Sequence, residues 1–150
     1  MVMCVGSGGM VGHSSAVHSV ASLLAALGFE VFREFKVYCQ WPRYVRLDVV
    51  GVCARREVCR DMVVVVEVES EEYIDPKLLD RLRAALKHAK PRPTHIFILT
   101  WRALTYSKLI EIAILNKILD PKTAKIHVVS NIDMLKKLLD YHITRYRNQT

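Results

Sequence analysis

The hydrophobic residues of the chain follow helical spacing in some segments and strand-like spacing in others. Near the start, apolar residues three or four apart predict a helix that Ser14 or Ser15 caps and that runs to Leu27. Gly28 then provides the stop. The apolar face of this helix consists of Val17, Val20, Leu23, Leu24 and Leu27.

Three strand-like runs follow, at residues 30–38, 44–53 and 60–69. The third run contains four consecutive valines, which is typical of a central strand buried on both faces. Short turn-like links separate the runs, and the link ARREV between the second and the third is interpreted as a hairpin turn. The pattern therefore predicts an antiparallel meander.

The second half of the chain alternates helical and strand patterns. Its predicted elements are a helix opened by Asp75-Pro76 up to about Ala89, a strand at 94–100, a helix at about 105–119, a strand at 125–130, and a helix capped by Asn131 up to about Tyr146. The whole order, αβββαβαβα, predicts an α/β fold with a central mixed sheet flanked by helices. We expect residues 1–12 to be a flexible glycine-rich leader and residues 13–150 to be one domain.

The helix at about 105–119 is apolar nearly all round. Such a helix is either well buried or part of a contact between subunits. The second interpretation predicts a homodimer.

Composition and charge narrow the class of protein. A net charge of +7 and a pI near 9.4 favour a polyanionic partner such as DNA, although many basic proteins have none. No apolar run reaches the ~18 residues of a membrane-spanning helix, and the first residues lack the pattern of a secretory signal, so we expect a cytoplasmic protein. The chain has only three Asn and two Gln, a bias typical of thermophile proteins.

The four cysteines, Cys4, Cys39, Cys53 and Cys59, include no pair with the spacing of a zinc knuckle. Cys53 and Cys59 flank the expected hairpin turn and would face each other across two strands. Free thiols are the preferred interpretation in a cytoplasmic protein, while a disulfide between these two stays open because some hyperthermophiles form such bonds inside the cell.

The leader contains GSGGMVG, which invites comparison with phosphate-binding loops. A dinucleotide-binding fingerprint starting at Gly6 needs glycine where the chain has Val11, and a P-loop ending at Gly12 needs Gly and Lys where it has Ser7 and His13. No nucleotide cofactor is therefore expected, and nucleotide binding is a third functional hypothesis that the spacing disfavours.

Three acidic residues interrupt the apolar strands. Asp48 lies in the second strand, and Glu67 and Glu69 follow the valines of the third. Period-two geometry puts Glu67 and Glu69 on one face of the sheet, and a tight hairpin brings Asp48 beside Glu67. Carboxylates gathered in this way repel one another, and Mg²⁺ or Mn²⁺ would relieve the repulsion. The alternative is that the acids reach solvent at frayed strand ends.

Asp on the second strand and Glu-x-Glu on the third, in this order of elements, resemble the PD-(D/E)xK nuclease superfamily. The stretch LGFEVFREFKVYCQWPRYVRLDVVGV, followed by VVVVEVES, is similar to archaeal Holliday junction resolvases and related small nucleases. The resemblance covers about residues 13–100 and implies a restriction-endonuclease-like αβββαβ core, extended here by a C-terminal αβα. It implies that Asp48 and Glu67, with the carbonyl of Val68, hold Mg²⁺ or Mn²⁺, which activates water for attack on a phosphodiester.

The chain departs from the family pattern at Glu69, where the family has a lysine. Glu69 would then be a third ligand or a base. Some branches of the superfamily carry an acid here or supply the lysine from another element, and Lys36 and Lys77 are the candidates for a displaced catalytic lysine. Glu34 on the first strand is either an additional acid of the site or an exposed strand residue.

Several basic residues are candidates for contacts with nucleic acid. Arg46 lies two residues before Asp48, on the same face, where pairing with a carboxylate is favoured over pairing with a phosphate. His13 and His18 are near the start of the first helix, where a phosphate would dock, although His18 is expected to be a partly buried polar residue. The arginines of the expected hairpin turn, which suit DNA phosphates or form an ordinary exposed tip, are Arg55, Arg56 and Arg60.

These residues lead to two main functional hypotheses. The first is a metal-dependent DNA endonuclease acting on branched or otherwise unusual DNA. The second is a catalytically weak or inactive nuclease-fold module that binds nucleic acid or a partner protein, and Glu69 is the feature that supports it.

Overall fold

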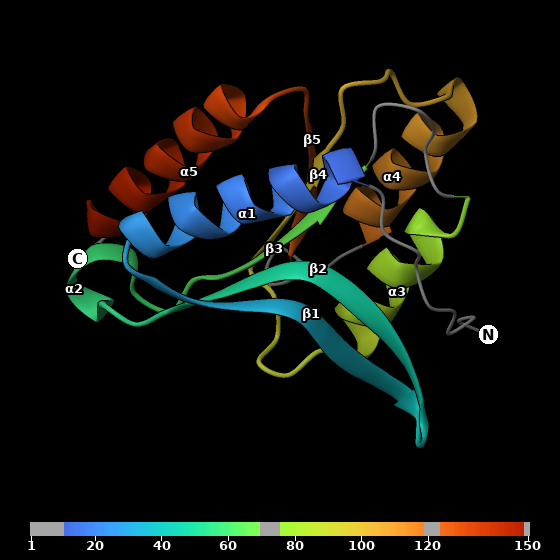
Figure 1. Cartoon of the computed structure of the whole chain (residues 1–150), viewed down its shortest axis with the longest axis horizontal. Coiled ribbons are helices and arrows are strands. Elements are labelled where there is room, and N and C mark those ends of the chain that lie inside the picture. The colour runs from blue at the N-terminus through green and yellow to red at the C-terminus, as the bar shows by residue number, and fades with distance from the viewer. Residues whose placement is uncertain (1–10, 70–75, 119–123, 149–150) are drawn as a thin grey trace.

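The computed structural model describes residues 11–69, 76–118 and 124–148. Within them, five strands form one mixed sheet in which spatial neighbours are also neighbours in sequence (Figure 1). The strands are β1 (Phe29–Gln40), β2 (Arg43–Cys53), β3 (Val63–Val68), β4 (His95–Leu99) and β5 (Lys125–Val129). The pairs β1–β2 and β2–β3 are antiparallel, which confirms the predicted meander, whereas β3–β4 and β4–β5 are parallel.

Helices cover both faces of the sheet (Figure 1). One face packs against α1 (Val11–Ala26) and α5 (Ile132–Arg147), and the other packs against α3 (Leu78–His88) and α4 (Tyr106–Ile118). Each parallel step therefore crosses over through a helix, as expected for parallel strands. The prediction of an α/β fold with a central mixed sheet flanked by helices is confirmed.

The central strand β3 explains how the two faces are built. All its residues are buried, and they alternate between the two cores. Val64 and Val66 pack on the side of α1 and α5, and Val63 and Val65 pack on the side of α3 and α4. A run of valines suits such a strand because both faces are apolar.

The start of the first helix differs from the prediction. Helix α1 already includes Val11 and Gly12, so Ser14 and Ser15 are exposed residues inside the helix and do not cap it. The proposed leader thus overlaps the helix at residues 11–12, and its remainder, residues 1–10, lies outside the described residues. The end is as expected, since Gly28 adopts a φ of 98°, the left-handed conformation that favours glycine.

The connection between β2 and β3 corrects two interpretations. Residues 56–59 form a short helix, α2 (Arg56–Cys59), in place of the predicted hairpin turn. This helical turn brings Cys59 to a Cα–Cα distance of 5.7 Å from Cys53, and the two form a disulfide. The preference for free thiols was therefore wrong for this pair, and the bond links a strand end to a helix, not two strands.

The remaining helices match the predictions closely. Helix α3 begins at Leu78, after a turn at Pro76 and Lys77, whereas Asp75 lies outside the described residues. In α5, the Asn131 side chain accepts a hydrogen bond of 2.8 Å from the backbone N–H of Met134, which confirms the predicted cap.

In the described part of the chain, none of the helices combines the length and apolar character needed to cross a membrane.

Candidate carboxylate site

The three acids lie where β2 leaves β3. The backbone pairing between these strands ends at Val49 and Val66, and side chains continue it. The N–H of Asp48 donates to Glu67 Oε1 at 3.0 Å, and the N–H of Val68 donates to Asp48 Oδ2 at 2.7 Å. Asp48 therefore lies beside Glu67, as predicted from strand geometry.

A buried arginine holds the two glutamates. Arg81 of α3 donates from Nε to Glu67 Oε2 at 3.0 Å and from Nη2 to Glu69 Oε1 at 3.2 Å. Glu67 and Glu69 thus share one face of the sheet, as predicted. Glu67, Glu69 and Arg81 are at most 3% exposed and Asp48 is 9% exposed, so the alternative that these acids reach solvent at frayed strand ends is wrong.

The site carries an excess of negative charge. Among the described groups in contact here, three carboxylates face the Arg81 guanidinium and the His13 imidazole. Burial raises the pKa of Glu67 well above its usual range, and the charge of Asp48 raises it further, while Arg81 acts in the opposite direction. Even with its arginine in place, the pair Asp48–Glu67 is therefore short of positive charge.

His13 closes the site on the side of α1. Its Nε2 lies 3.2 Å from Asp48 Oδ1, and this is the partly exposed edge of the cluster. The hydrogen bond to Asp48 raises the pKa of His13, and burial opposes the rise. His13 therefore contacts the acids from the first turns of α1, whereas it was predicted as a phosphate contact.

The two candidate lysines lie in different places. Lys36 is exposed on β1, with its ammonium 4.8 Å from the centre of the Tyr44 ring, so the structure gives it a cation–π contact. Lys77 is half-buried and precedes Arg81 by one turn, because the Arg81 N–H bonds to the Lys77 carbonyl. Residues four apart share a helix face, so Lys77 is on the side of α3 that carries Arg81. Arg81 itself is the site residue that the sequence analysis missed.

Other predicted contacts are not part of this cluster. Among the described residues, Arg46 lacks the favoured carboxylate partner and donates instead to the Tyr44 hydroxyl at 3.4 Å. His18 is exposed and bonds to Arg33 at 2.8 Å, so the expectation of partial burial was wrong. Glu34 was considered either an additional acid of the site or an exposed strand residue. It is exposed, and its φ is 50°.

The arginines of the β2–β3 connection lie away from the acids. Arg55 and Arg56 are exposed, Arg60 is half-buried, and Arg56 pairs with exposed Asp61 at 3.5 Å. They precede β3, whereas Glu67 and Glu69 lie at its far end, and Figure 1 shows α2 apart from that end. The structure therefore does not bring this arginine group to the carboxylate site.

A basic groove lies between β1 and the end of α3. It has a volume of about 510 Å³ and is lined by Phe35, Lys36, Val37, Tyr38, Lys87, His88, Ala89 and Lys90. Beside it, exposed Trp41 packs on Tyr38 with ring centres 4.9 Å apart. Basic and aromatic side chains together are typical of surfaces that bind nucleic acid.

Comparison with known proteins adds no relative to this description. No family model, curated protein or solved structure matches the chain. The fold is an α/β sandwich with a five-stranded mixed sheet, and the chemistry of the site rests on its own residues.

Proposed function

We propose that the chain is a metal-dependent nuclease of the restriction-endonuclease-like fold that hydrolyses phosphodiester bonds in DNA, with branched or unusual DNA as the substrate class. The observation that carries the proposal is the Asp48–Glu67 pair, two buried carboxylates that lie side by side on adjacent strands, with Arg81 in contact with Glu67 and Glu69. Magnesium-dependent nicking of supercoiled or branched DNA tests it. The proposal includes a cytoplasmic location, where such DNA would be met.

The donor atoms of the site suit a hard divalent cation. Asp48 and Glu67 supply carboxylate oxygens, and the carbonyl of Val68 is close by in sequence, which is the oxygen set that Mg²⁺ and Mn²⁺ prefer. The Asp48 oxygen that faces His13 is at the partly exposed edge, where an ion would enter. When bound, the ion would supply an activated water and charge stabilisation at the phosphate.

Arg81 and Glu69 take the place of the missing lysine in this proposal. Arginine stays protonated, so Arg81 neutralises the glutamates and orients Glu67 but does not accept a proton. Glu69 is left as the base or further ligand, and Lys77, whose carbonyl accepts from the Arg81 N–H, is the lysine that we propose for contact with a phosphate. Lys36 belongs instead to the basic groove.

The basic groove supports DNA as the partner. Replacing Lys87 and Lys90 by alanine should weaken binding to all DNA sequences alike and lower the slope of log affinity against log salt by about one per lysine, since each phosphate contact releases a counterion. Fluorescence anisotropy over a salt series measures this. Lys137→Ala, an exposed lysine of α5 paired with Asp133, is the matched control and should leave the slope unchanged. An unchanged slope in the groove variant would contradict the assignment.

Helix α4 supports a homodimer as part of the proposal. It leaves apolar side chains exposed, among them Leu109, Ile110 and Ile114, so the alternative of a well-buried helix was wrong for this face. Such an unpaired apolar face is typical of a subunit contact. Sedimentation velocity should show a dimer that Ile114→Glu converts to a monomer, and a monomeric native chain would reject this part of the proposal.

A second candidate function is a nuclease-fold module that binds DNA or a partner protein without cleaving. The observation that favours it is the bridge from Arg81 to both glutamates, because it already satisfies part of the charge that a metal would neutralise. This candidate predicts salt-sensitive DNA binding that needs no divalent ion and survives Asp48→Asn. Nuclease activity that depends on Asp48 would exclude it.

A further inference from the structure

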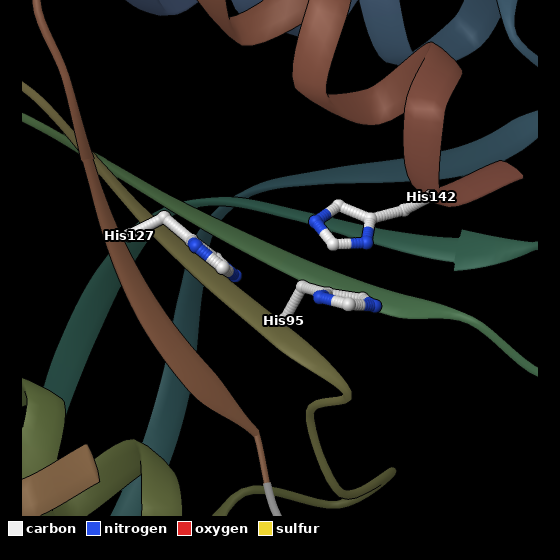
Figure 2. Close-up of side chains that lie close together, drawn as sticks. All are labelled: His95, His127 and His142. Atoms are coloured by element: carbon white, nitrogen blue, oxygen red, sulfur yellow. The ribbon is translucent and has the colours of Figure 1, made fainter. Parts of the chain in front are cut away.

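Three histidines gather on the face of the sheet that packs against α5, whereas Arg81 lies on the other face. His95 begins β4, His127 lies in β5, and His142 lies in α5, and Figure 2 shows their side chains converging between the sheet and the helix. One ring nitrogen from each lies within 4.8 Å of the others. The three come from segments far apart in sequence, so only the fold brings them together.

The sheet register fixes the positions of two of the three histidines. His127 is paired with Phe97, two residues after His95, so both histidines lie on the same face of adjacent parallel strands. That face packs against α5 through Leu135 and Leu139. His142 follows Leu139 by three residues and is therefore on the packed side of the helix.

We propose that His95, His127 and His142 form a binding site for a transition-metal ion of the zinc class. Zn²⁺, Cu²⁺ and Ni²⁺ bind imidazole nitrogen well, whereas Mg²⁺ prefers oxygen ligands. An ion about 2.1 Å from each nitrogen requires them to be about 3.4 Å apart, so small side-chain rotations suffice. Three protein ligands leave a coordination position for water or an anion, as in sites that act on a substrate.

The state of the rings supports this assignment. His127 Nε2 is buried and has no hydrogen-bond partner among the described residues. Burial lowers the pKa of His95 to about 3, with smaller effects from His142 and His127, and burial also lowers the pKa of those two rings. A lowered pKa favours the neutral imidazole, which is the form that binds metals. Lys125 and Arg145 add positive charge nearby, which favours an anion as the further ligand.

The site is separate from the carboxylates and does not rest on the proposed nuclease function. Glu67 is paired with Ile98, near the end of β4, whereas His95 stands at its start. The two clusters also use opposite faces of the sheet, since Ile98 packs with the core of α3 and α4. A metal at one site therefore leaves the other in place.

Zinc titration of the full chain against a chromophoric chelator tests the proposal, after the protein has been stripped with EDTA. We expect a zinc ion bound at the histidines with a Kd of about 1 µM or below. His127→Phe and His142→Phe, which keep a ring in each packed position, should weaken binding by at least about 100-fold. Asp48→Asn should retain the zinc ion at the histidines, because Asp48 is not among its ligands.

Thermal unfolding of the same proteins shows whether the variants fold. Zinc should raise the Tm of the native chain and of Asp48→Asn but not that of the histidine variants. If a phenylalanine variant does not fold, His142→Gln replaces it. Absence of zinc binding by the native chain, or zinc binding retained in both histidine variants, would overturn the proposal, as would loss of zinc binding in Asp48→Asn.

Discussion

Replacing Arg81 by methionine should lower the free energy of unfolding by about 3–5 kcal/mol, because it leaves Glu67 and Glu69 buried without their cation. At this chain length the loss corresponds to a drop in Tm of about 10 °C. Arg83→Met is the matched control on the same helix. The Arg83 side chain is 39% exposed and forms ion pairs with Asp80 and Glu111. Its replacement should lower the free energy of unfolding by less than about 1 kcal/mol.

The loss at Arg81 should also depend on pH. Burial and Asp48 raise the pKa of Glu67, and removing Arg81 takes away a group that lowers it. The folded variant then holds a proton that the unfolded chain releases, so its stability falls as pH rises through the raised pKa. Denaturant unfolding at pH 5 and pH 8 should show a greater deficit at pH 8.

A compensating variant separates charge from packing. Adding Glu67→Gln and Glu69→Gln to Arg81→Met removes the unpaired charges and should restore most of the lost stability. A deficit of less than about 1 kcal/mol in Arg81→Met alone would contradict the account of the bridge. A deficit that persists unchanged in the triple variant would assign it to packing.

Asp48→Asn should weaken Mn²⁺ binding by at least about 100-fold, because a neutral amide replaces a charged oxygen at the exposed edge of the site. Asparagine keeps an oxygen for the Val68 N–H, so the local strand geometry should be retained. Calorimetry in the presence of a short DNA duplex measures the binding. Asp61→Asn, an exposed acid beside Arg56, is the control and should bind like the native chain.

The His cluster must be excluded as the source of any Mn²⁺ signal. The titration is therefore repeated with His127→Phe, which should still bind Mn²⁺ at the carboxylates. Binding that survives Asp48→Asn but disappears in His127→Phe would contradict the assignment of the hard-ion site. No binding by the native chain with DNA present would contradict it as well.

Strand periodicity was sufficient to predict the acid cluster. The alternation of β3 and the meander put Asp48 beside Glu67. The structure confirms this with hydrogen bonds from the Asp48 N–H to Glu67 and from the Val68 N–H to Asp48. The prediction worked because these acids interrupt apolar strands, where each residue has only two directions to point. Element order likewise predicted the flanked mixed sheet.

The site residues that were missed lie on helices, as Arg81 and His142 do, and on the parallel strands, as His95 and His127 do. Arg81 falls in the stripe of Leu78, Leu82 and Ala85, and His142 follows Leu139 by three residues, so both interrupt buried helix faces. This signal was present in the sequence, but the strand that each helix packs against depends on the crossover connections. The α2 turn was missed for a different reason, since four residues are too few to show a helical period.

The central claim is tested most directly by incubating supercoiled and four-way-junction DNA with the native chain and with Asp48→Asn, in Mg²⁺ and in EDTA. The account predicts nicked or resolved DNA only with the native chain and Mg²⁺, and intact DNA with Asp48→Asn even though it still binds the DNA. Equal cleavage by the Asp48→Asn protein would contradict the assigned site. Binding by the native chain without any cleavage would contradict the nuclease proposal and leave the non-cleaving module.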